Sequence, residues 1–96
     1  MVSMSDIQSQ RERILEIARQ HGASHVRIFG SVSRGSESST SDIDLLVSMA
    51  PNRSLLDRIA LIHDLEDLLH NSVDVVNERA LHPVIRDEVL AEAVEL

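Results

Sequence analysis

The chain has 96 residues, 43% of them hydrophobic, which suffices for one small domain with a single modest core. It contains no cysteine, which excludes disulfides, thiolate metal sites and a cysteine nucleophile. The net charge is −7 and all nine basic residues are arginine, a balance that argues against non-specific nucleic-acid binding, which needs a basic surface.

The first predicted element is an amphipathic helix from Ser5 to Gln20, with Ser5 as its N-cap. Its apolar stripe consists of Ile7, Ile14, Ile17 and Ala18. Gly22 is expected to end the helix in the left-handed conformation. We find no basic and apolar leader and no apolar run of membrane-spanning length, so a cytoplasmic protein without membrane contact is expected.

A first strand is predicted over His25 to Phe29, followed by a turn at Gly30-Ser31 and a single helical turn over Val32 to Arg34. A glycine–serine turn between a strand and a helix presents backbone N–H groups that suit a phosphate. The serine-rich segment 35–41 is predicted to be an exposed loop, either a plain connection or a flap over the phosphates.

Asp42 and Asp44 open a second predicted strand, which runs from Asp42 to Ser48. Alternate residues of a strand share one face, so both carboxylates are expected to project to the same side, where they repel each other. A cation between them removes that penalty, and Mg²⁺ prefers carboxylate oxygens. Taken alone, the pair also fits solvated residues at a strand start or a Ca²⁺ site.

Three elements complete the chain: a helix over Ser54–His70, a strand over Val73–Asn77, and a helix from His82-Pro83 towards Leu96. The predicted core positions of the two helices are Leu55, Ile59, Ile62, Leu65, Leu69, Ile85, Val89 and Ala93. Three further leucines widen the stripe of the longer helix and are candidates for contact with a partner, namely Leu56, Leu61 and Leu68.

The expected fold class is α/β (α+β), a small mixed sheet with helices packed on it in the order α-β-α-β-α-β-α. The first two strands must run antiparallel for Gly30 to meet Asp44, and the helical crossover makes the second and third strands parallel. Asp74 then lies at the entrance of the third strand, beside Asp42 and Asp44. One sheet edge would thus carry three carboxylates and the Gly30-Ser31 turn.

These residues resemble a known family pattern. Gly30-Ser31, a spacer of ten residues (32–41), Asp42-Ile43-Asp44 and the later Asp74 are similar to the nucleotidyltransferase superfamily that includes DNA polymerase beta. The short length resembles its smallest branch, the minimal nucleotidyltransferases of the MntA type. The resemblance implies a polymerase beta palm-like fold, with residues 1–96 forming a single minimal nucleotidyltransferase domain.

The resemblance also implies an activity and its site. Asp42, Asp44 and Asp74 would be catalytic and would hold two Mg²⁺ ions, while Gly30, Ser31 and Arg34 would bind the nucleotide. The reaction implied is transfer of AMP from ATP to a hydroxyl group. The partner implied is a HEPN-type helical toxin, modified on tyrosine, with this chain as the antitoxin of a type VII-like toxin–antitoxin pair.

Several alternatives stay open at this point. The chain could be a non-catalytic nucleotide-binding antitoxin that masks its partner, because position 32, often basic in relatives, is Val32 here. Transfer to a small molecule is a third reading, although no acceptor pocket is evident in the sequence. Arg34 could instead pair with Glu37. A homodimer is compatible with the sequence, which does not fix the assembly state.

Overall fold

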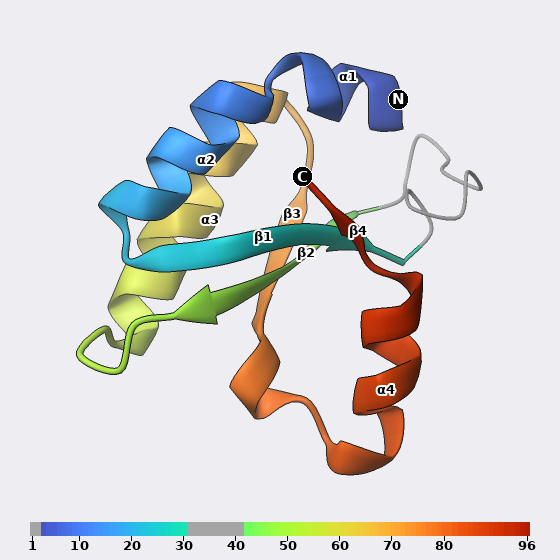
Figure 1. The fold of residues 1–96 in the computed structure, drawn as a ribbon. Coiled ribbons are helices and arrows are strands. Elements are labelled where there is room, and N and C mark those ends of the chain that lie inside the picture. The colour runs from blue at the N-terminus through green and yellow to red at the C-terminus, as the bar shows by residue number, and fades with distance from the viewer. Residues whose placement is uncertain (1–2, 31–41) are drawn as a thin grey trace.

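The structure is a computed structural model that describes residues 3–30 and 42–96. In chain order its elements are α1 (Met4–Ser9), α2 (Arg11–Gln20), β1 (Ala23–Phe29), β2 (Ile43–Met49), α3 (Leu55–Leu69), β3 (Val73–Asn77), the 3-10 helix η1 (Glu78–Ala80), α4 (Pro83–Glu92) and β4 (Val94–Glu95) (Figure 1). The predicted short helix between the first two strands lies outside the described residues.

The four strands form one mixed sheet in the order β3-β2-β1-β4. The predicted antiparallel pairing of β1 with β2 and parallel pairing of β2 with β3 are both confirmed. The predicted last helix is wrong at its end, because α4 stops at Glu92 and the chain returns to the sheet as β4. There Val94 pairs with Ile28, and the N–H of Leu96 donates to the carbonyl of Val26 at 3.0 Å.

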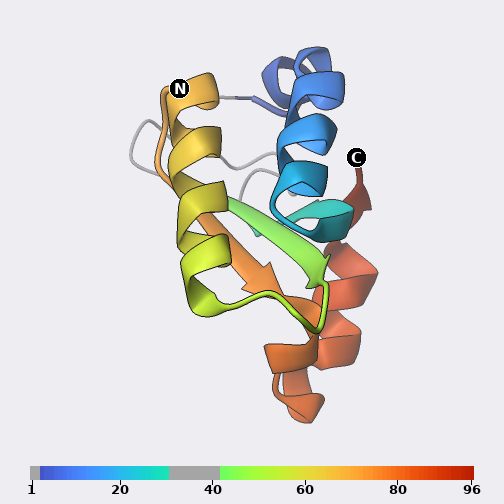
Figure 2. The same ribbon diagram turned by 90° about the vertical axis from the view of Figure 1, so that its left-hand side faces the viewer.

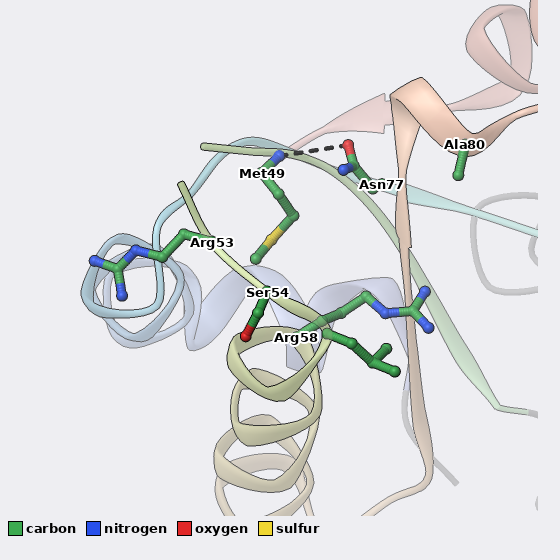
Figure 3. A pocket seen from close by; sticks show the side chains of 7 residues that line it. Met49, Arg53, Ser54, Arg58, Asn77 and Ala80 are labelled. Carbon is green, nitrogen blue, oxygen red and sulfur yellow. Dashed lines mark hydrogen bonds between the residues drawn. The ribbon is translucent and has the colours of Figure 1, made fainter. Parts of the chain in front are cut away.

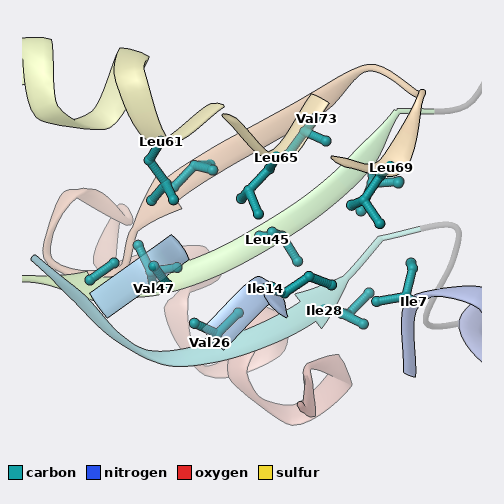
Figure 4. Packing of buried hydrophobic residues seen from close by; sticks show 14 of the residues in the cluster. Ile7, Ile14, Val26, Ile28, Leu45, Val47, Leu61, Leu65, Leu69 and Val73 are labelled. Carbon is teal, nitrogen blue, oxygen red and sulfur yellow. The ribbon is translucent and has the colours of Figure 1, made fainter. Parts of the chain in front are cut away.

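Helices α2 and α3 cover one face of the sheet, and α4 lies on the other side (Figures 1 and 2). The main core lies between α2, α3 and the sheet, and Figure 4 shows its packing. Its buried side chains include Ile14, Ala18, Ile28, Ile43, Leu45, Val47, Leu61, Leu65, Leu69, Val73 and Val75. Because odd-numbered residues of β2 and β3 face this core, Asp44 and Asp74 belong to the opposite face.

The start of the chain differs from the single helix expected over Ser5–Gln20. Gln10, at φ −103° and ψ 13°, separates two helices. The N-cap is Ser3 rather than Ser5, because Ser3 and Asp6 exchange hydrogen bonds in a capping box. Gly22, at φ +79°, follows the end of α2 in the left-handed conformation, as expected.

The buried face of α3 also differs from the prediction. Leu61, Leu65 and Leu69 are buried, whereas Leu55 and Ile59, expected in the core, are exposed. Leu55 instead lines a pocket at the ends of β2 and β3, beside Met49 and Asn77. Similarly, α4 has no buried residue, and Ile85 is exposed. None of the helices in the described part of the chain combines the length and apolar character needed to cross a bilayer.

Candidate functional site

The turn after β1 requires glycine for two independent reasons. Gly30 has φ +79°, a conformation that side chains with a Cβ rarely adopt. A Cβ built on Gly30 would overlap Oδ2 of Asp44. The backbone at the end of β1 therefore lies directly against the Asp44 carboxylate, and the predicted approach of Gly30 to Asp44 is confirmed.

Strand register brings two of the predicted acidic residues side by side. Asp44 pairs with Phe29 of β1 on one side and with Asp74 of β3 on the other. Directly paired residues on neighbouring strands, about 4.8 Å apart, project to the same face of a sheet. Asp42 lies immediately before β2 and two residues from Asp44. Thus the backbone places Gly30, Asp42, Asp44 and Asp74 at one rim of the sheet.

Two contacts fix this rim. The N–H of Ile43 donates to the carbonyl of Ser72 at 2.9 Å, which joins the entrances of β2 and β3. The N–H of Val73 donates to Oε2 of Glu66 at 3.0 Å, so α3 holds the strand one residue before Asp74. Glu66 was not among the predicted site residues, since no local pattern predicts that a helical carboxylate binds the backbone of the next strand.

The donor set fits Mg²⁺ by chemistry and by strand register, because Asp42, Asp44 and Asp74 offer hard carboxylate oxygens at one rim. Their side chains are not already gathered, since the described residues include no group of three His, Asp or Glu placed to hold a metal ion. Mutual repulsion favours separated carboxylates until a cation is bound. The remaining predicted residues, Ser31 and Arg34, lie outside the described residues.

An ion pair lies farther along the same face. Nη2 of Arg27 on β1 donates to Oε2 of Glu78 on η1 at 2.7 Å, and both side chains are largely buried. The hydrogen bond and charge of Arg27 hold the pKa of Glu78 below its usual value. The ion pair crosses over β2 at Leu46, which is fully buried and is the β2 residue opposite Arg27 in the strand register. It links β1 to the end of β3 and so stabilises the arrangement of the strands that carry the rim.

A pocket of about 320 Å³ lies at the opposite end of β2 and β3 (Figure 3). It is lined by Met49, Arg53, Ser54, Leu55, Arg58, Asn77 and Ala80. Met49 and Asn77 are the last residues of their strands, whereas Asp44 and Asp74 are near the first, so this pocket is separate from the carboxylate rim. The sequence analysis did not predict it.

Comparison with known proteins matches residues 12–96 to the family model for polymerase beta nucleotidyltransferases. A Methanocaldococcus jannaschii protein provisionally named protein adenylyltransferase MJ0435 is 38% identical over 91 residues, covering 95% of this chain and 98% of that protein. The protein adenylyltransferase MntA of Thermococcus cleftensis is 38% identical over 79 residues, covering 82% of this chain and 80% of its own.

Solved structures give the same result for the fold. A protein provisionally named a minimal nucleotidyltransferase superposes with a TM-score of 0.90 at 44% identity, over 99% of this chain and 97% of that one. A toxin–antitoxin structure with AMP-PNP gives 0.75 at 27% identity, over 88% and 69% of the two chains. A complex of a tri-AMPylated Shewanella oneidensis HEPN toxin with its MNT antitoxin gives 0.69 at 24% identity, over 92% and 69%, a likeness of fold.

Proposed function

Because the chain belongs to the polymerase beta nucleotidyltransferase family, and is thus a nucleotidyltransferase, we propose that it transfers AMP from ATP to a hydroxyl group of a partner protein. The observation that carries this proposal is the pairing of Asp44 with Asp74 at the rim where Gly30 lies against the Asp44 carboxylate. A phosphoryl-transfer enzyme must chiefly position its reactants and neutralise charge, and a rim of carboxylates beside a glycine turn suits that task.

In this proposal the residues have distinct tasks, and Asp74 has two. Asp42, Asp44 and Asp74 hold two Mg²⁺ ions, which when bound neutralise charge on the phosphates and on the attacking and leaving oxygens. The amides of the Gly30-Ser31 turn and the Ser31 hydroxyl bind the outer phosphates of ATP, and Arg34 adds positive charge there. Asp74, on the outermost of the three strands, accepts the proton of the acceptor hydroxyl.

The proposed partner is a HEPN-type toxin modified on tyrosine, with this chain as the antitoxin of a type VII-like pair. The MntA-named relative and the toxin–antitoxin structure with AMP-PNP support a protein acceptor and an adenine nucleotide. The rim lies on the sheet face opposite α2 and α3, and Asp42 and Asp74 are exposed there, so a partner's side chain can approach it.

The test compares Asp44→Asn with a matched change of charge at Asp67→Asn, on the exposed surface of α3. Each protein is incubated with Mg²⁺, ATP labelled at the α-phosphate, and the protein encoded by the adjacent gene. We expect labelled partner with the wild type and Asp67→Asn, and at least a hundredfold less with Asp44→Asn at unchanged melting temperature. Mass spectrometry then identifies the modified side chain. Full transfer by Asp44→Asn would rule out the proposed site.

The second candidate is an antitoxin that masks its partner without catalysis. Val32 is the observation in its favour, because the family resemblance implies a basic residue at that position. In that case the wild type binds the partner tightly and neutralises it, no label reaches the partner, and Asp44→Asn neutralises equally well.

A further inference from the structure

Exposed apolar side chains of the described residues gather at two places. At the start of α3, Leu55 is 60% exposed, Leu56 75% and Ile59 39%; we call these residues the α3 patch. At the start of α4, Val84 is 79% exposed and Ile85 45%; these form the α4 patch. Val94 is the other large apolar side chain of the described residues that is exposed. Burying such side chains is favourable, so each patch is suited to a contact.

The α3 patch borders the pocket at the carboxyl ends of β2 and β3, since Leu55 belongs to both (Figure 3). Arg53 and Arg58 line this pocket, and Nη1 of Arg53 is paired with Oδ1 of Asp57 at 3.3 Å. Arg58 is held in place by a 3.0 Å hydrogen bond from Nη1 to the carbonyl of Val75. In a chain with a net charge of −7, Arg58 therefore gives this pocket a local positive charge beside its apolar border.

Helix α4 has the complementary character. It has no buried residue: Val89 and Leu90 are half-buried, and the rest of the helix is exposed. Besides Val84 and Ile85 it carries Asp87, Glu88 and Glu92 against the single cation Arg86, a formal charge of −2 (−3 + 1). Opposite charges and exposed apolar side chains on the helix and the pocket favour a contact between α4 of one molecule and the pocket of another.

We propose that two copies of this chain associate by placing α4 of each copy against the α3 patch and pocket of the other. Charge complementarity selects the second copy as the occupant, because the chain itself carries both surfaces. The reciprocal exchange buries both patches of both copies and closes a two-fold dimer, whereas a one-way contact would propagate into a filament. Met49 is six residues beyond Ile43, about 20 Å along β2, so the pocket half of the contact lies away from the carboxylate rim.

The test uses Leu56→Glu and Val84→Glu, which change side chains at least three-quarters exposed, with Gln20→Glu on the exposed end of α2 as the charge-matched control. Sedimentation equilibrium over a range of concentrations measures the dimer dissociation constant. We expect a dimer for the wild type and the control. Each patch variant should raise the dissociation constant about tenfold or more, since it loses an apolar burial at each of the two contacts.

Mixing the two variants identifies the contact. A Leu56→Glu copy retains an intact α4, and a Val84→Glu copy retains an intact pocket, so the mixture keeps one of the two contacts and should dimerise more tightly than either variant alone. If only one of the two variants loses the dimer, the proposal is overturned in favour of a pocket–pocket or helix–helix contact. The same holds if the dissociation constant of the mixture is no lower than those of the separate variants. A monomeric wild type whose patch variants lose binding to the toxin overturns it in favour of a partner contact. None of these readouts depends on AMP transfer.

Discussion

Replacing Gly30 by alanine should reduce activity at the rim much more than it reduces the stability of the fold. The added Cβ meets two obstacles, a φ of +79° and Oδ2 of Asp44. The conformational cost of a left-handed alanine is about 1–2 kcal/mol, partly offset by the lower entropy of the unfolded chain. We therefore expect a net loss of about 1 kcal/mol, or about 4–8 °C in melting temperature for a domain of this size.

The effect on activity should be much larger. The carboxylate of Asp44 must move away from the new methyl group, and a displacement of about 1 Å at a reacting centre can reduce the rate about a hundredfold. Gly22→Ala is the matched control, because Gly22 also has φ +79° but its Cβ would meet the flexible side chain of Arg53, 2.5 Å from Cγ and Nε. That side chain can move away from the methyl group without disturbing the rim.

Thermal unfolding followed by circular dichroism and transfer of labelled AMP to the partner should be measured on both variants. We expect similar losses of melting temperature, and a loss of transfer confined to Gly30→Ala. The reasoning is refuted if Gly30→Ala transfers AMP at the wild-type rate, or if Gly22→Ala loses as much activity as Gly30→Ala.

Two further predictions concern stability. His70 caps α3 in the left-handed conformation at φ 53° and is exposed, so His70→Gly should raise the melting temperature by a few degrees. His63→Gly, within the same helix, should lower the melting temperature by about as much. Shifts of both variants in the same direction would contradict this account. Arg27 lowers the pKa of Glu78 in the folded protein. The ion pair therefore adds about 1 kcal/mol to the free energy of unfolding at pH values above the ordinary glutamate pKa. This contribution is lost as the pH falls through the lower pKa of the folded state. Urea unfolding at about pH 6 and about pH 3.5 should therefore show a smaller loss of stability on acidification for Glu78→Gln than for the wild type, and parallel losses would argue against it.

The sequence by itself determined the features that depend on near neighbours along the chain. Alternation predicted Asp42 and Asp44 on one side of a strand, and β2 begins one residue after Asp42. The crossover helix predicted the parallel pairing of β2 with β3, which is confirmed. The predicted strand over Val73–Asn77 matches β3, and the helix predicted over Ser54–His70 matches α3 with its two caps. These features follow from backbone periodicity and local capping, which are written in a few consecutive residues.

The tertiary structure alone decided the features that depend on distant parts of the chain. Leu61 rather than Ile59 faces the core because the position of α3 over the sheet selects the buried side of a helix with apolar residues on most sides. Val94 and Glu95 become a strand because the edge of β1 offers unpaired backbone groups. Glu66 holds the strand that carries Asp74 through a contact that no periodic pattern encodes. Periodicity in the sequence shows which positions are apolar. Only packing in three dimensions decides which of these side chains are buried and which elements bury them.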